Sequence, residues 1–204
     1  MKKALLALAI ATTLATPSAF ASDSGWYLLG GYGGATSNTD QATLDNSLTS
    51  AGGKGFTSSL TNPSVYGLGV GYKVKENVAI EGGYIGSTNE TYNASGGNLI
   101  AAGVSATATV TGEYVSVVGF YPATDKFSLL GKLGVASITD NMSVTTTTTT
   151  SLAGSKADLT YGIGAQYEFT DAFFGRFQID SYNIGTSTSA TRTNVWEFAV
   201  GYRM

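Results

Sequence analysis

The chain has 204 residues, of which 12% are charged, and it contains no cysteine and no histidine. It therefore forms no disulfide, and chemistry that depends on a thiol or an imidazole is excluded. The formal net charge is −3 and becomes −5 without Lys2 and Lys3, which lie in an N-terminal segment expected to be removed, so the composition argues against nucleic acid as a partner.

The first 21 residues have the parts of a secretory signal peptide. These are a basic start, a short apolar stretch and a small-x-small cleavage site (Lys2 and Lys3, Ala4–Ala11, and Ala19–Ala21). We expect residues 1–21 to be removed and residues 22–204 to form one domain, because no shift in composition divides them. Beyond the signal there is no run of about 18 apolar residues, which excludes helical membrane spans but not strand spans of about 9 to 11 residues.

The rest of the chain contains segments in which bulky apolar residues alternate with small or polar residues, the pattern of β-strands. Eight such strands are predicted: Trp26–Ala35, Ser64–Val74, Asn77–Gly86, a fourth ending at Tyr121, Phe127–Ile138, Leu159–Phe169, a seventh starting at Phe173, and Val195–Met204. Tight polar turns follow the second, fourth and sixth strands, whereas longer polar segments make the other connections. A repeated β-hairpin is therefore the predicted unit.

Some segments are harder to interpret. Thr36–Asn62 is rich in Ser, Thr, Asn and Gly and is interpreted as a loop, as is the polar stretch after the third strand, through about Gly97. The Thr145–Thr150 run is interpreted as an extended loop or as a strand continuing past the membrane. The fourth strand has two registers: aligning its end with Tyr167 favours one set of residues on the bulky face (Val115, Val117 and Tyr121), whereas bulk alone favours another (Tyr114, Val118 and Phe120).

The two faces of the strands differ in volume, which indicates the face that lies inside. An eight-stranded barrel has an interior just wide enough for side chains to fill, so four or five large residues per strand do not fit inward. The glycines and alanines fit there, and the bulky face then points outward. Such a surface exceeds the few hundred Å² that a soluble monomer tolerates, whereas a bilayer requires it. A soluble sandwich with a buried aromatic face is the alternative.

With these features the chain resembles the small eight-stranded outer-membrane barrels of Gram-negative bacteria, of the OmpA transmembrane-domain and opacity-protein type. The resemblance rests on the signal, the Gly25–Tyr27 opening, the strand count and the Gly201–Met204 close. It implies an all-β fold, an eight-stranded antiparallel up-and-down transmembrane β-barrel, in the cell outer membrane after signal-dependent export to the periplasm. It also implies contact with outer-membrane lipid and lipopolysaccharide, and insertion by the barrel assembly machinery. The family usually ends in Phe or Trp, which that machinery recognises, whereas this chain ends in Met204.

We expect one face of the last strand to contact lipid and four charged side chains to meet in the lumen. The lipid-facing residues are Trp196, Phe198, Val200 and Tyr202. The lumen network comprises Glu81, Lys132, Arg176 and Glu197, because an unpaired charge in so narrow a space would cost several kcal/mol. OmpA-type barrels are similar in filling their interior with paired Glu, Lys and Arg.

No catalytic residue, cofactor or metal site is expected. Barrels of similar size that are enzymes resemble one another in relying on histidine, and the remaining acids suggest only a carboxylate pair as an alternative (Glu81, Glu113, Asp180 and Glu197). Two functions stay open: a structural or adhesin-like protein whose loops meet an extracellular ligand, especially Thr36–Asn62 and Asn89–Val104, or a narrow porin-like channel for ions or small solutes. Channels that carry solutes have about 16 to 18 strands, which favours the first function.

Overall fold

The structure is a computed structural model, and it describes residues 25–36, 41–98, 103–185 and 190–204. The predicted signal peptide lies outside the described residues. Strands dominate the described chain: β1 (Trp26–Thr36), α2 (Gln41–Ser50), β2 (Thr57–Thr61), β3 (Ser64–Lys75), β4 (Val78–Ser87), β5 (Glu90–Ser95), β6 (Val104–Pro122), β7 (Phe127–Thr145), β8 (Thr149–Glu168), β9 (Phe173–Gly185) and β10 (Ala190–Arg203). Among the described residues, no helix is long and apolar enough to cross a membrane.

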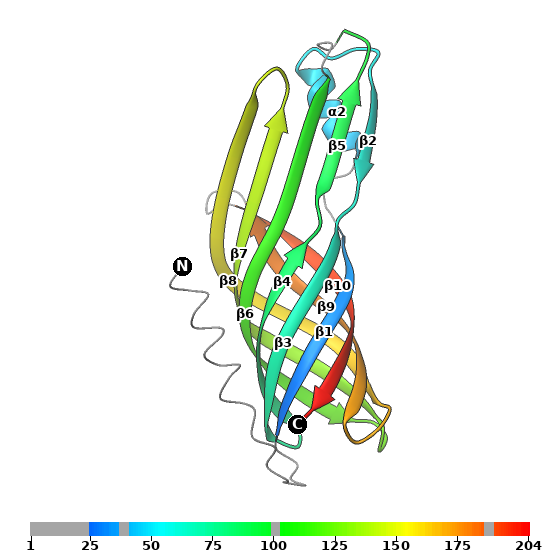
Figure 1. Cartoon of the computed structure of the whole chain (residues 1–204), viewed down its shortest axis with the longest axis vertical. Helices are drawn as coiled ribbons and strands as arrows, with labels where there is room; N and C mark the ends of the chain where they lie inside the picture. The colour runs from blue at the N-terminus through cyan, green and yellow to red at the C-terminus, as the bar shows by residue number, and fades with distance from the viewer. Residues whose placement is uncertain (1–24, 37–40, 99–102, 186–189) are drawn as a thin grey trace.

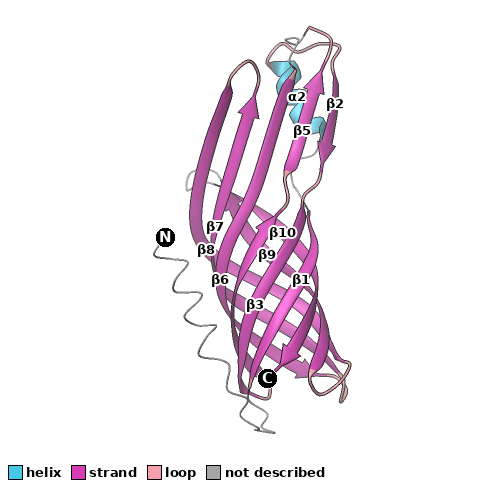
Figure 2. Ribbon diagram, viewed as in Figure 1, coloured by secondary structure: helices cyan, strands magenta, loops and turns pink. Residues whose placement is uncertain are grey.

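Eight of the described strands close into an antiparallel barrel (Figures 1 and 2). Their order around the barrel is β1, β3, β4, β6, β7, β8, β9 and β10, and each pairs with its neighbours in that order. The first and last strands pair from Tyr27 with Arg203 to Thr36 with Asn194, which closes the ring. The predicted fold class, an eight-stranded antiparallel up-and-down β-barrel, is therefore confirmed.

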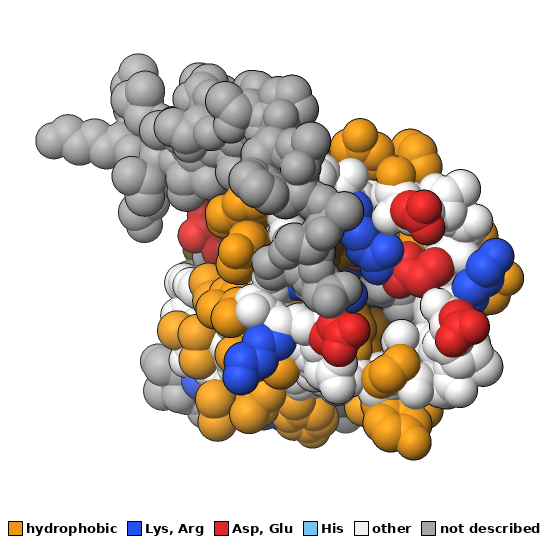
Figure 3. All heavy atoms as spheres, turned by 90° about the horizontal axis from the view of Figure 1, so that it is seen from below, with side chains coloured by type: hydrophobic (Ala, Val, Ile, Leu, Met, Phe, Trp, Pro, Cys, Tyr) orange, Lys and Arg blue, Asp and Glu red, His pale blue; other side chains and the backbone are white. Residues whose placement is uncertain are grey.

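Short turns define one end of the barrel, which we call the short-turn end. Two of them repeat one local design, in which a Thr hydroxyl accepts a hydrogen bond from the backbone N–H three residues later, from Phe127 to Thr124 and from Phe173 to Thr170, each at 3.0 Å. This Thr-based turn starts the next strand without further residues. Figure 3 views the molecule from this end and shows acidic and basic side chains over its visible part, with hydrophobic side chains around the rim.

A sheet continues beyond the barrel at the opposite end, which we call the long-loop end. Strands β6, β7 and β8 have 19, 19 and 20 residues, and their outer parts pair with each other past the rim. Strand β5 pairs with the start of β6, and β2 pairs with β5. We call β2, β5, α2 and the outer parts of β6, β7 and β8 the long-loop extension (Figure 1).

The interpretation of two segments as loops was wrong. Thr36–Asn62 contains α2 and β2, and the stretch before Gly97 contains β5. Strand β6 extends past the end of its barrel neighbour β4, so the backbone N–H and C=O groups of its first residues have no partner in β4. Strand β5 pairs with these groups. Helix α2 has only Leu44 and Leu48 as large apolar residues, too few for a helical pattern to be recognised in the sequence.

The Thr145–Thr150 run is divided between two strands, which agrees with its interpretation as a continuing strand and not with that as an extended loop. Strand β7 ends at Thr145 and β8 begins at Thr149, so only the residues between them make the turn. The backbone N–H of Thr146 donates to the carbonyl of Thr148 at 3.0 Å. Threonine suits these exposed strands because its branched Cβ favours extended backbone.

The outward face of the barrel is an apolar band with aromatic side chains at both edges. Exposed aromatics gather near the short turns (Trp26, Tyr72, Tyr121, Phe127, Tyr167, Phe169, Phe173 and Tyr202) and form a second ring toward the long-loop end (Tyr32, Tyr66, Tyr84, Tyr161 and Trp196). Exposed polar side chains accompany the second ring: Glu113 lies opposite Tyr84, and Asn194 lies two residues beyond Trp196. An apolar band between aromatic girdles is the lipid-facing surface of a membrane barrel.

The register of the fourth predicted strand, now β6, follows the alignment with Tyr167. Val115, Val117 and Tyr121 are 57%, 52% and 71% exposed. Val118 and Phe120 are buried inside the barrel. The choice based on bulk alone was wrong because large side chains also fill part of the lumen.

Candidate functional site

The lumen is filled in layers that follow the period of two along each strand. Strand β4 places Ala79, then Glu81, then Ile85 on the inside, at increasing distance from the short turns. The lower apolar layer lies toward the short-turn end (Tyr27, Leu29, Ala79, Val118, Phe120, Leu130, Phe174 and Ala199). The upper apolar layer lies toward the long-loop end (Val65, Ile85, Ala136, Ile138, Tyr182 and Val195). Charged side chains lie between these two layers.

The charged layer, which we call the ionic layer, consists of Glu81, Lys132, Arg176 and Asp180. The Arg176 guanidinium donates to Glu81 Oε1 at 2.5 Å. The Lys132 ammonium lies 3.8 Å from Glu81 Oε2 and 3.3 Å from Asp180 Oδ2. All four side chains are buried. Two acids and two bases therefore alternate in one chain of contacts, which limits the cost of burying each charge.

Neutral side chains add hydrogen bonds to this layer. Tyr27 donates to Glu81 at 2.6 Å, and Gln166 accepts from Arg176 at 2.9 and 3.1 Å. Gln178 donates to Asp180 at 2.9 Å. Glycine makes room for the rings below, since a Cβ at Gly71 would meet the Tyr27 ring.

The structure brings together three of the four residues predicted for the lumen network. Glu81, Lys132 and Arg176 are in contact, whereas Glu197 makes no ion pair within the described chain, so its assignment to the network was wrong. Its carboxylate instead lies where a Cβ at Gly31 or Gly67 would be. Asp180 takes the fourth place, and its inward position four residues after Arg176 was a signal available in the sequence.

The four residues predicted to face lipid lie on the outer face of β10. Trp196, Phe198, Val200 and Tyr202 are 40%, 64%, 60% and 45% exposed. Their neighbour Ala199 is buried, at 5% exposure. The strand therefore has the two faces that its alternation indicates, with the bulky side chains outward.

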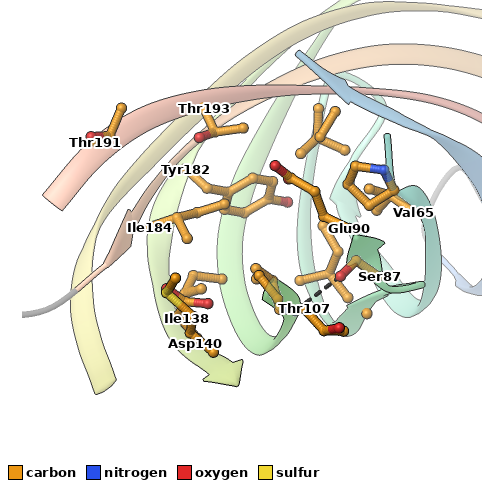
Figure 4. Close-up of a pocket in the computed structure, with 18 of the residues that line it drawn as sticks. Val65, Ser87, Glu90, Thr107, Ile138, Asp140, Tyr182, Ile184, Thr191 and Thr193 are labelled. Carbon is orange, nitrogen blue, oxygen red and sulfur yellow. Dashed lines mark hydrogen bonds between the residues drawn. The ribbon is translucent and has the colours of Figure 1, made fainter. Parts of the chain in front are cut away.

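A cavity of about 290 Å³ opens at the long-loop end above the upper apolar layer, and we call it the mouth cavity (Figure 4). Barrel strands and the long-loop extension both contribute to its wall (Ala35, Leu44, Leu60, Pro63, Val65, Ile85, Gly86, Ser87, Glu90, Tyr92, Ala106, Thr107, Ala108, Val110, Ile138, Asp140, Met142, Tyr182, Ile184, Thr191, Thr193 and Val195). Most of these side chains are apolar. The two charged ones, Glu90 and Asp140, are both acidic.

Helix α2 is held against β2 and β5, within the long-loop extension, by polar contacts. The Tyr92 hydroxyl donates to Asp45 at 2.6 Å, and the Gln41 amide donates to Ser58 Oγ at 2.9 Å. Hydrogen bonds from Ser58 and Tyr92 lower the pKa of Asp45. Burial, with the hydrogen bond to Asp45, raises the pKa of Tyr92 to about 12, so this tyrosine stays a donor at neutral pH.

The acids of the ionic layer are separated from the mouth cavity by the upper apolar layer. Glu81 and Asp180 share Lys132 as a counter-ion beneath the upper apolar layer, away from any solute at the mouth. Among the described residues, no group of three or more acidic side chains is placed to hold a metal ion. The sequence did not reveal the mouth cavity, because β2, β5 and α2, which contribute to its wall, were interpreted as loops.

Solved structures of bacterial proteins have a similar fold. Ail, the attachment invasion locus protein of Yersinia pestis, solved in complex with the heparin analogue sucrose octasulfate, is 15% identical, with 89% of this chain and 97% of that chain covered at a TM-score of 0.52. The N-terminal β-barrel domain of Pseudomonas aeruginosa OprF is 13% identical, with 88% and 98% covered at a TM-score of 0.50. At such identities the likeness concerns the fold alone.

Sequence comparison identifies the family. No curated protein sequence matches this chain significantly. The family model described as outer membrane protein beta-barrel domain matches residues 4–203, nearly the whole chain. The match agrees with the closed barrel, the apolar outer band and the aromatic girdles. This protein therefore belongs to the outer membrane protein beta-barrel domain family.

Proposed function

We propose that this protein is a non-enzymatic outer-membrane barrel with a closed lumen, whose long-loop extension acts at the cell surface in contact with an extracellular ligand. The observation that carries the proposal is the ionic layer between two apolar layers. A lumen filled in this way supports a structural or interaction role for the barrel, with the extension as the part that meets other molecules.

The burial of the ionic layer argues against the alternative of a narrow channel. Glu81, Lys132, Arg176 and Asp180 are 1%, 5%, 2% and 3% exposed, so these charges do not line an open aqueous path. Opening such a path requires Arg176 to leave Glu81, and separating a buried ion pair costs several kcal/mol. The aromatic rings of the lower apolar layer also fill the lumen, on the short-turn side of the ionic layer.

The proposal includes the route to the membrane and the orientation there. Residues 1–21 act as a signal for export and are removed, and residues 22–204 are inserted by the barrel assembly machinery. The outer band then contacts lipid, with lipopolysaccharide around the long-loop end. The short turns face the periplasm and the extension faces outward. The apolar band and the two aromatic girdles support this arrangement.

A non-enzymatic role is supported by composition and by the site. The chain has no histidine or cysteine, and Glu81 and Asp180 of the ionic layer are held by the buried bases Arg176 and Lys132. The likeness to Ail does not extend to its ligand. The mouth cavity of this chain carries acidic groups, whereas sucrose octasulfate is a polyanion.

Recording from planar lipid bilayers tests the closed lumen. Purified protein is expected to give no steady conductance, with a large porin as the positive control. A steady single-channel current from the native chain would contradict the proposal. The surface role is tested by cell–cell settling of bacteria that express either the native chain or a variant in which residues 41–61 are replaced by a short Gly-Ser linker. The linker variant should settle more slowly, and equal rates would remove the support for α2 and β2 as interaction elements.

A further inference from the structure

We propose that the mouth cavity binds a small hydrophobic cation, of the alkylammonium or arylammonium class, with its apolar body on the upper apolar layer and its charge beside Glu90 and Asp140. This inference goes beyond the proposed function, because it assigns a small-molecule site to a place that a closed barrel does not need. It does not depend on what the outer surface of the extension contacts.

The cavity has the shape of a binding site with a closed floor. Val65, Ile85 and Ile138 belong both to its wall and to the upper apolar layer, and the ionic layer lies below them. Its volume of about 290 Å³ is at the lower end of the range for small-molecule pockets. A compact ligand therefore fits, and its apolar atoms contact side chains that otherwise face open space.

The charges of the wall select the sign of the ligand. Among the described residues that line the cavity, the charged ones are Glu90 and Asp140, and none is Lys or Arg. Within the described chain, neither carboxylate takes part in an ion pair or a side-chain hydrogen bond, although both are half-buried. Partial burial makes an opposite charge favourable for a carboxylate. The described chain supplies no such charge to either acid.

Electrostatics at the two acids agrees with this assignment. Burial raises the pKa of Asp140. Burial and repulsion from Asp140 raise the pKa of Glu90. Geometry places the two acids together: both line the mouth cavity, and Glu90 pairs with Ala108 and Asp140 with Val110 on the two edges of β6, so one ligand can reach both. A bound cation would offset both effects, since an opposite charge favours the ionised form of a carboxyl group.

The nearby basic side chains are already engaged. Lys156 pairs with Asp158 at 2.9 Å, and the Arg192 guanidinium lies 4.9 Å from the centre of the Tyr161 ring. Neither lines the cavity. The counter-charge for Glu90 and Asp140 is therefore expected from a ligand.

An aromatic side chain in the wall adds to the preference for a cation. Figure 4 shows the Tyr182 ring and the Glu90 side chain extending into the same space. An ammonium group between a carboxylate and a ring face gains both an ion pair and a cation–π contact. A neutral ligand of the same shape gains only the apolar contacts.

Three probes with one adamantane cage separate charge from shape: 1-adamantylammonium, neutral 1-adamantanol and anionic 1-adamantanecarboxylate. Binding is measured by calorimetry on the native chain in phosphatidylcholine nanodiscs, with empty nanodiscs subtracted. We expect the ammonium probe to bind about tenfold tighter than the alcohol, and the carboxylate not to bind.

Variants assign the effect to the cavity. Glu90→Gln with Asp140→Asn should weaken binding of the ammonium probe about tenfold and leave that of the alcohol unchanged. Glu76→Gln with Asp125→Asn removes the same charge from exposed positions at the short-turn end and should change neither affinity. Ala108→Phe fills the cavity and should weaken both probes. Heat-modifiable migration in gels checks that each variant is folded.

Two results would overturn the proposal. One is an affinity for the ammonium probe no greater than that for the alcohol in the native chain, including no binding of either. The other is undiminished binding of the ammonium probe by the folded Glu90 and Asp140 variant. A steady conductance in bilayers would end the closed-lumen proposal but leave these binding results unaffected.

Discussion

Replacing Arg176 with Ala should destabilise the barrel more than replacing any one outward-facing side chain with a smaller side chain. The guanidinium makes the buried contact with Glu81 and donates twice to Gln166. It also lies 5.6 Å from the ring centres of Phe120 and Phe174. Its loss would leave two buried acids to share one base, Lys132.

The magnitude follows from the charge that remains. Removing one partner of a buried pair costs about 3 to 5 kcal/mol, because the other charge stays buried without compensation. Replacing Arg176 with Met and Glu81 with Gln together leaves the Lys132–Asp180 pair, at 3.3 Å, balanced. The amide oxygen introduced by Glu81→Gln still accepts from Tyr27 in this variant. The double variant should therefore be more stable than Arg176→Ala by about 2 kcal/mol.

Urea unfolding in detergent micelles, followed by the fluorescence of Trp26 and Trp196, measures both free energies. Glu197→Gln is the matched control, because Glu197 lies in the lumen without an ion pair among the described residues, and it should change stability much less. If Arg176→Ala unfolds at the same urea concentration as the native chain, the ionic layer does not stabilise the barrel. An Arg176→Met, Glu81→Gln variant less stable than Arg176→Ala would also contradict the pairing.

Three further outcomes test the orientation and the extension. Val200→Arg, near the middle of the outer band, should cost about 2 to 4 kcal/mol in the same unfolding assay, and Ala199→Ser, on the inner face, much less; equal effects would remove the basis for the lipid-facing assignment. An impermeant thiol reagent on intact cells should label a cysteine placed at Thr147, at the tip between β7 and β8, and not one at Asp125; labelling at Asp125 alone would invert the topology. Tyr92→Phe removes the hydrogen bond to α2 and should speed hydrogen exchange in α2 while leaving β10 unchanged, so unchanged exchange in α2 would show that this bond does not hold the helix.

The sequence by itself determined the barrel. Alternation with a period of two is a local property, so the chain shows in its order which residues of a strand face in and which face out. The repeated Thr-Asp turns before Phe127 and Phe173 mark where hairpins reverse. Volume then separates the two faces, because the lumen of an eight-stranded barrel does not hold every bulky side chain.

Only the tertiary structure decided which side chains meet. Arg176 and Glu81 are 95 residues apart, and barrel strands are staggered, so equal distance from a short turn does not mean equal depth in the lumen. That stagger brings Asp180 to Lys132 and places Glu197 against the glycines of β1 and β3. The long-loop extension was missed for a related reason: β5 exists because β6 continues beyond β4, and a strand that forms on a neighbour's free edge needs no apolar pattern of its own.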